Sequence, residues 1–228
     1  FFKLPVLSNG DFDIKHQNSV VEKHNIIKDI RQTINLYKKQ LQTLDVLIDA
    51  EFLEYIPTLI GDLFDVRKGL SKYTKSYGQS NRGEYPVYSA SNLAPLTHID
   101  TYDYNGRYLT WATNGFAGYI KIIEGRFSIN GDRGLLIPKD INIDIGFIKY
   151  VLEPKLRALA KGRKGDNGKD EFTKVYPDML KSVLIDMPTL PNGDFDLGKQ
   201  KQIAERYEQI ENIKRLLLME LNKLQEVD

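Results

Sequence analysis

The sequence predicts an α+β fold: one mixed α/β domain flanked by two long, repeated helices that form an antiparallel coiled coil. Two observations support this prediction. Residues 4–45 recur near the end of the chain as residues 187–228, aligned without a gap at an offset of 183 residues. Between the copies, tyrosine, glycine, serine and asparagine become frequent and apolar runs shorten to strand length, which is typical of a domain with β-structure.

Each copy predicts a long helix, because apolar residues recur every seven positions, the spacing of helices that pack as a coiled coil. A helix over residues 17–44 would be about 42 Å long, too long to bury its apolar stripe on a small domain alone. The other copy is therefore the expected partner, although an ordinary domain with helical ends is the alternative. The predicted seam consists of Val20, Ile27, Ile30, Ile34, Leu41, Ile203, Ile210, Ile213, Leu217 and Leu224.

The repeat also suggests how the chain is divided. Residues 1–5 correspond to residues 184–188, where the central domain ends, so residues 1–15 are interpreted as the end of a preceding domain and a turn. Residues 16–50 form the first helix, 51–190 the central domain and 191–228 the second helix. The chain is then either a fragment of a two-domain protein or a short form that pairs with another copy of itself.

Within the central domain, short β-prone runs predict strands at residues 84–90, 107–112, 117–123 and 134–138. Residues 146–160 have helical periodicity, with Pro154 as an expected kink. A glycine-rich basic loop follows at residues 161–168.

Composition limits the possible functions. The chain has 228 residues, of which 41% are hydrophobic and 28% charged, values typical of a soluble globular protein. It has no apolar run long enough to span a membrane, and no cysteine for disulfides or thiolate metal sites. These features agree with a cytoplasmic location. The net charge of only +1 means that any nucleic-acid surface must be local.

Catalytic patterns are weak. The three histidines do not cluster in the sequence, and we recognise no phosphate-binding or nucleophile motif. Asp144, Glu153 and Lys155 follow the order used by many metal-dependent nucleases, which leaves a nuclease as an alternative. Such a triad normally converges from neighbouring strands on Mg²⁺. Because Glu153 and Lys155 flank a proline in helical sequence, catalysis is not favoured, and no metal or cofactor is expected in the chain.

Local charge favours DNA binding instead. Residues 67–82 hold five basic side chains and no acid, interleaved with tyrosine, glutamine, serine and asparagine. Residues 155–164 form a second acid-free basic stretch. Lysine and arginine neutralise phosphates, whereas glutamine, asparagine, serine and arginine can read base edges. The alternative is that both stretches are solvated surface loops.

The central domain opens with two motifs, at residues 61–69 and 85–92. They resemble the start of a target recognition domain of the specificity (S) subunits of type I restriction–modification systems. Taken in order with the other motifs of the chain, the resemblance covers essentially the whole sequence. The repeated helices correspond to the family's two conserved spacer helices. Lys199 stands where the family usually has glutamate, and the turn sequence Asn-Gly-Asp-Phe-Asp lengthens the approach to each helix. Further motifs lie at residues 102–109, 115–119 and 185–205.

The resemblance implies a non-catalytic subunit that reads one half of a bipartite site in double-stranded DNA. It also implies that the spacer helices dock modification subunits, which bind S-adenosylmethionine and methylate adenine, and that restriction subunits join this core. A half-subunit is expected to self-associate as a dimer. Alternatives are a nuclease or methyltransferase fragment and a coiled-coil adaptor that does not bind DNA.

Together, the basic stretches and the resemblance predict one DNA-contacting face. Its predicted residues are Lys68, Lys72, Tyr73, Lys75, Tyr77, Gln79, Ser80, Asn81, Arg82, Ser89, Ser91, Asn92, Trp111, Thr113, Asn114, Lys161, Arg163, Lys164, Asn167 and Lys169.

Overall fold

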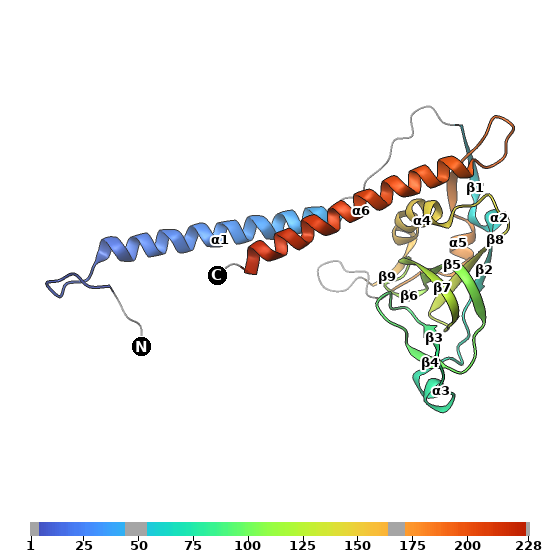
Figure 1. The fold of residues 1–228 in the computed structure, drawn as a ribbon, viewed down its shortest axis with the longest axis horizontal. Helices are drawn as coiled ribbons and strands as arrows, with labels where there is room; N and C mark the ends of the chain where they lie inside the picture. Colours follow the sequence, from blue (N-terminus) through green and yellow to red (C-terminus); the bar gives the residue numbers. More distant parts are fainter. Residues whose placement is uncertain (1–4, 44–53, 164–171, 227–228) are drawn as a thin grey trace. The chain divides into compact units, whose positions relative to one another are not determined.

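The computed structural model describes residues 5–43, 54–163 and 172–226 (Figure 1). The chain divides into two compact units. The first comprises Phe1–Ile48 and Tyr207–Asp228, and the second comprises Asp49–Arg206. Long helices near both ends of the chain and a sheet-containing domain between them confirm the predicted fold class. In the described residues, no helix is long and apolar enough to cross a membrane.

The first unit contains helix α1 (Ile14–Thr43) and the later part of helix α6 (Leu197–Glu226). These two segments run in opposite directions in Figure 1. Ile34 is buried, with 7% of its surface exposed, and Leu41 and Ile210 are partly buried. The remaining predicted seam residues of this unit with described side chains are about half exposed: Val20, Ile27, Ile30, Ile213 and Leu217.

The seam therefore differs from the prediction of one apolar stripe buried along its whole length. Ile203, which was predicted to belong to the seam, lies in the second unit, where it is 6% exposed. The side chain of Leu224 lies outside the described residues.

The run Asn-Gly-Asp-Phe-Asp builds the same turn before both helices. In each copy the glycine has a positive φ, +90° at Gly10 and +89° at Gly193. This left-handed conformation favours glycine. The last aspartate of each run caps the helix that follows: Asp13 Oδ1 accepts from the backbone N–H of His16 at 2.9 Å, and Asp196 Oδ1 accepts from that of Lys199 at 2.8 Å.

A six-stranded sheet forms the framework of the second unit, with strand order β2–β8–β5–β7–β3–β4. All neighbouring pairs are antiparallel except β3 and β7, which are parallel. The predicted strands at residues 84–90, 107–112, 117–123 and 134–138 overlap β3, β5, β7 and β8, respectively. The strands are β2 (Phe64–Lys68), β3 (Tyr85–Tyr88), β4 (Thr97–Ile99), β5 (Tyr104–Ala112), β7 (Ile120–Ile129) and β8 (Arg133–Pro138).

Smaller elements complete the second unit. Strands β1 (Tyr55–Leu59) and β11 (Leu184–Pro188) pair antiparallel, which joins the two ends of the domain. A three-stranded sheet has the order β6–β10–β9. Its strands are β6 (Asn114–Gly115), β9 (Lys161–Arg163) and β10 (Phe172–Lys174). The helices are α2 (Ile60–Leu63), α3 (Lys75–Ser80), α4 (Ile145–Leu159) and α5 (Pro177–Lys181).

The core of the second unit lies between the sheet and α4, which runs through Pro154 and buries Phe147, Ile148, Leu152 and Leu156. Trp111 is completely buried in β5, opposite Gly134 of β8. A Cβ atom on Gly134 would lie 2.1 Å from the indole ring, so glycine is required there for close packing. The indole N–H donates to the carbonyl of Val175 at 3.2 Å.

The beginning of α6 also packs in the second unit, through Gln200, which is fully buried. Its Oε1 accepts from the backbone N–H of Asp144 at 2.8 Å, and its Nε2 donates to the carbonyl of Asn142 at 2.9 Å. Both groups precede α4, so Gln200 joins the start of one helix to the start of the other.

Candidate nucleic-acid interface

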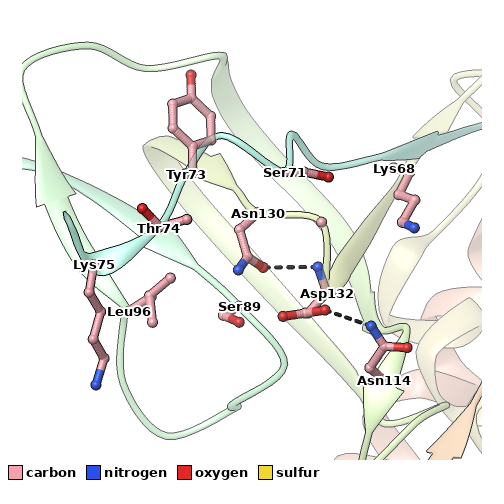
Figure 2. A pocket seen from close by; sticks show the side chains of 11 residues that line it. Lys68, Ser71, Tyr73, Thr74, Lys75, Ser89, Leu96, Asn114, Asn130 and Asp132 are labelled. Atoms are coloured by element: carbon pink, nitrogen blue, oxygen red, sulfur yellow. Dashed lines mark hydrogen bonds between the residues drawn. The ribbon is translucent and has the colours of Figure 1, made fainter. Parts of the chain in front are cut away.

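A polar concavity of about 470 Å³ lies where β2, β3 and β7 end and β8 begins (Figure 2). Figure 2 shows Lys68 and Lys75 at opposite sides of its lining. Both lysines are exposed. The lining residues are Lys68, Ser71, Tyr73, Thr74, Lys75, Ser89, Leu96, Asn114, Asn130, Gly131 and Asp132.

The β7–β8 turn, residues 130–132, forms one wall of the concavity. Asn130 Oδ1 accepts from the backbone N–H of Asp132 at 3.0 Å, and Asp132 Oδ1 accepts from the amide of Asn114 at 2.6 Å (Figure 2). The backbone N–H of Thr113 donates to the carbonyl of Asp132 at 2.9 Å. These bonds hold an amide and a carboxylate side by side in fixed positions, an arrangement that offers both donors and acceptors to a ligand.

The loop over residues 89–92 contributes Ser89 to the lining, and the buried guanidinium of Arg133 anchors this loop. Arg133 Nε donates to the carbonyl of Ser89, and Nη2 donates to the carbonyls of Ala90 at 3.2 Å and Ser91 at 3.0 Å. Nη2 also donates to Asn92 Oδ1 at 2.6 Å, and Nη1 donates to Thr110 Oγ1 at 2.9 Å. Burial lowers the pKa of Arg133 to about 10.

Lys121 supports the same loop from β7. Its Nζ donates to the carbonyl of Asn92 at 2.9 Å and lies 4.9 Å from the ring centre of Tyr88. Burial, and next the neighbouring charge of Arg133, lower the pKa of Lys121. Two basic side chains thus hold one short loop by its carbonyl groups.

Helix α3 and the residues before it form the third part of the site. The hydroxyl of Thr74 caps α3 by accepting from the backbone N–H of Tyr77 at 3.1 Å. The Lys72 ammonium lies 5.1 Å from the ring centre of Tyr73 and 6.0 Å from that of Tyr77. Gly78 packs against Thr97 so closely that a Cβ atom would lie 1.9 Å from the threonine hydroxyl oxygen, which fixes α3 against β4.

The second basic stretch is partly described. Lys161 is exposed on β9, and strand register aligns Lys161, Lys174 and Asn114 across the three neighbouring strands. Neighbouring strands are about 4.8 Å apart, so the backbone of Lys161 lies two strands, or about 10 Å, from that of Asn114, which lines the concavity. The side chain of Arg163 and the whole of Lys164, Asn167 and Lys169 lie outside the described residues.

Three predicted contact residues are buried, and this corrects their expected role. Trp111, Thr113 and Tyr73 are 0%, 2% and 1% exposed. Trp111 packs on Gly134, and the Thr113 hydroxyl donates to the carbonyl of Gly131 at 3.3 Å. The Tyr73 hydroxyl donates to Asp103 Oδ1 at 2.9 Å. Burial, reinforced by this hydrogen bond, raises the pKa of Tyr73 to about 12. These side chains support the site from within.

The concavity brings together Lys68, Tyr73, Lys75, Ser89 and Asn114 of the predicted residues. The other predicted residues of the described part do not line it: Lys72, Tyr77, Gln79, Ser80, Asn81, Arg82, Ser91, Asn92, Trp111, Thr113 and Lys161. Of the predicted readers of base edges, Gln79 and Arg82 are exposed. Asn81, Asn92 and Asn114 each have one side-chain amide atom already bonded within the protein.

Sequence reasoning missed Asp132, Arg133, Lys121 and Lys174. Asp132 and Arg133 are neighbours in the sequence, one acidic and one basic, so a search for basic stretches without acidic residues does not find them. A hairpin signal was available, because Asn130-Gly131-Asp132 separates two β-prone runs. Which loop these residues would meet depends on strand order, which no local pattern gives.

The possible nuclease triad does not converge on a metal site. Asp144 caps α4 by accepting from the backbone N–H of Phe147, and Glu153 accepts from that of Ile120. Lys155 donates to the carbonyl of Leu184. Each side chain thus has a structural role, and the described residues contain no group of three or more acidic or histidine side chains placed to hold a metal.

A sheet that presents polar loops beside exposed lysines is an arrangement suited to binding a polar or anionic ligand. The model of the type I restriction modification DNA specificity domain matches residues 57–227. The chain therefore belongs to this family, and the recognised resemblance is confirmed. Membership also agrees with the prediction of a recognition subunit that is not itself an enzyme.

Relatives and solved structures agree with this assignment. The chain is 41% identical, over 98 residues, to a putative type I specificity subunit of Mycoplasma pneumoniae, S.MpnORF507P, covering 42% of this chain and 27% of that protein. The fold matches the S subunit of a type I restriction–modification system from M. genitalium with a TM-score of 0.55, at 19% identity, over 75% of this chain and 43% of that chain.

It also matches the HsdS subunit of Thermoanaerobacter tengcongensis with a TM-score of 0.53, at 14% identity, over 92% of this chain and 53% of that one. The chain thus spans about a quarter of the length of the curated relative and about half the length of the two solved chains.

Proposed function

We propose that this chain reads one half of a bipartite site in double-stranded DNA, as part of a type I restriction–modification complex. The observation that supports the proposal best is the lysine-flanked concavity, because it lies in a domain of a DNA specificity family and offers fixed polar groups. Modification subunits, carrying S-adenosylmethionine, and restriction subunits are the proposed protein partners.

Phosphate contacts are assigned to exposed lysines around the concavity. Lys68 and Lys75 line it, and Lys72 lies beside Tyr73 in the same segment. Lys161 and Lys174 extend the row from β6 through β10 to β9. Because each neutralised phosphate releases counterions, these contacts supply affinity that depends on salt but little on sequence.

Base reading is assigned to Asn114 and Asp132 in the concavity, with Gln79 on α3 and Arg82 just after that helix. A carboxylate would repel phosphate, so Asp132 fits better against the exocyclic amino group of cytosine or adenine. The hydrogen bond from Asn114 to Asp132 fixes the direction in which the remaining acceptors point.

The test is a binding series with the assembled methyltransferase on duplexes that carry the organism's methylated motif or a scrambled motif. Lys75→Ala is expected to weaken both duplexes equally and to lower the salt slope by about one unit. Asp132→Asn, nearly isosteric, should cost about 1–3 kcal/mol on the motif and little on the scrambled duplex. Lys181→Ala is the matched control, because Lys181 is exposed on α5 and does not line the concavity.

The proposal is wrong if Lys75→Ala and Asp132→Asn both behave like the control. If the assembled complex binds the two duplexes alike and without salt dependence, a protein-binding adaptor becomes the better interpretation.

We also assign the helices of the first unit to docking of modification subunits. Ile26, Ile27, Leu216 and Leu217 are each about half exposed, and exposed apolar side chains in groups mark interaction surfaces. Substitution of Ile27 and Leu217 by serine should abolish co-purification with modification subunits and leave helix content unchanged. Unchanged co-purification would refute this assignment.

A further inference from the structure

The β3–β4 loop, residues 89–96, is held along its first half by two basic side chains. Arg133 donates to the carbonyls of residues 89–91, and Lys121 donates to that of Asn92. Carbonyl oxygens of four consecutive residues thus accept from cations of the domain. Because their partial negative charges are compensated there, a polyanion can approach this loop at a lower electrostatic cost.

The same loop carries Leu93, which is 96% exposed, more than any other large hydrophobic side chain of the described residues. Its backbone N–H donates to Ser91 Oγ at 3.2 Å. The backbone N–H of Leu96 donates to the carbonyl of Val87 at 2.7 Å, which closes the loop. Hydrogen bonds therefore hold the chain on both sides of Leu93, and its exposed position is fixed by the loop.

Both ends of the β3–β4 loop line the polar concavity, through Ser89 and Leu96 (Figure 2). Lys68 and Lys75 line the same concavity, and the loop contains no acidic residue. A single exposed leucine is ordinary on a protein surface. This one stands in a loop that borders a lysine-flanked site, so DNA whose phosphates contact the lysines would lie beside it.

The surroundings of Leu93 favour DNA over a protein as its contact. A stable protein interface buries about 800 Å² on each partner and is centred on several apolar anchors. Leu93 instead stands between Asn92 and Ala94, in a loop of mainly small and polar residues. Some DNA-binding proteins insert single apolar side chains, leucine among them, between base pairs, which unstacks the step and kinks the duplex.

We propose that Leu93 wedges between two stacked base pairs of the bound half-site, so that the chain reads the deformability of that step in addition to base edges. Pyrimidine–purine steps open most readily, so the wedged step is TA or CA/TG. This inference rests on the proposed DNA binding and adds to it a contact that hydrogen-bonding side chains do not supply.

The test uses the assembled methyltransferase and short duplexes that carry the organism's methylated motif. The fluorescent base 2-aminopurine replaces each adenine of the half-site in turn, and its emission rises when the base is unstacked. Each TA or CA/TG step contains an adenine. The adenine that is methylated serves as an internal reference, because methyltransferases extrude their target base. We expect a second bright position that Leu93→Ala abolishes and Leu93→Met retains.

Binding measurements on the same duplexes give a second readout. Leu93→Ala is expected to weaken binding to the motif about tenfold, the order of one lost base-pair contact, and to a scrambled duplex by less than about twofold. A stiffer step at the bright position should weaken binding by the native protein more than by Leu93→Ala. Ile141→Ala is the matched control and should change neither readout, because Ile141 is 91% exposed and does not line the concavity.

The outcomes separate this inference from the proposed function. If the native complex prefers the motif but no second bright position depends on Leu93, the wedge is overturned and DNA reading stands. If the native complex binds motif and scrambled duplexes alike, both are overturned. If Leu93→Ala loses co-purification with modification subunits and keeps the bright position, Leu93 contacts a protein and the proposal is wrong.

Discussion

Arg133 is predicted to hold the loop of residues 89–92 in place, and Arg133→Met tests this with an uncharged, unbranched side chain. The guanidinium makes hydrogen bonds to five acceptors and is completely buried. Hydrogen bonds to charged groups contribute about 1.5–3 kcal/mol each, so the gross loss is on the order of 10 kcal/mol. Removal of a buried cation offsets part of it, as the lowered pKa of Arg133 indicates.

Two features set the net value. The loop residues are partly exposed, so their carbonyl groups can form hydrogen bonds with water instead. Thr110 is fully buried, and its hydroxyl oxygen loses the hydrogen bond that Arg133 donates to it. Breaking a buried charged network typically costs about 3–5 kcal/mol, and we expect this range for Arg133→Met. Arg133→Lys should recover little, because an ammonium cannot reach acceptors spread along four consecutive residues.

The assay is urea unfolding followed by circular dichroism, with an unchanged m-value as the condition for comparison. Arg126→Met is the matched control: Arg126 is exposed on β7, with its guanidinium 5.3 Å from the ring centre of Tyr102. We expect the control to change the free energy of unfolding by less than about 0.5 kcal/mol. A loss below about 1 kcal/mol for Arg133→Met would refute the assigned role of the guanidinium.

Three further predictions follow from single contacts. Gly134→Ala should destabilise the second unit by several kcal/mol in urea unfolding, on the order of an overpacked core substitution, because its Cβ would meet the ring of Trp111; an unchanged midpoint would contradict this. Tyr73 has its pKa raised to about 12 from 10 in the folded state, so its stabilisation is complete below pH 10 and is lost as pH rises towards 12. The free energy of unfolding of Tyr73→Phe should therefore fall less steeply between pH 10 and 12 than that of the unmodified protein. Equal slopes for the two proteins over this pH interval would contradict the prediction. Ile27→Ser should change the free energy of unfolding of the isolated chain by less than about 0.5 kcal/mol, because Ile27 is already 49% exposed. A larger loss would show that the side chain is covered in solution.

Local sequence predicted the features that depend on local structure. The heptad spacing predicted α1 and α6, and the Asn-Gly dipeptides predicted the turns before them. Strand-length apolar runs predicted β5 and β8 within a few residues. Charge runs found Lys68 and Lys75, which line the concavity. These signals suffice because helix periodicity, turn chemistry and exposed charge are properties of neighbouring residues.

The supporting residues of the site could not be found in this way. Trp111 was predicted to contact DNA, yet β5 is a central strand and the indole packs against Gly134 on the neighbouring strand β8. Arg133 was passed over because Asp132 precedes it, yet strand order brings it under the loop of residues 89–92. Both assignments depend on which strands are neighbours, and the parallel pairing of β3 with β7 has no local signature.

The two copies of the repeat show, within one chain, which features follow from local sequence and which depend on tertiary packing. Gln17 and Gln200 follow the same turn, with the same capping aspartate and the same backbone bonds, so local sequence produces the same local structure at both places. Their environments differ, because Gln200 meets the backbone before α4 and Gln17 Nε2 meets no described partner. A sequence repeat therefore specifies local structure, whereas the burial and the hydrogen-bond partners of each copy depend on tertiary packing.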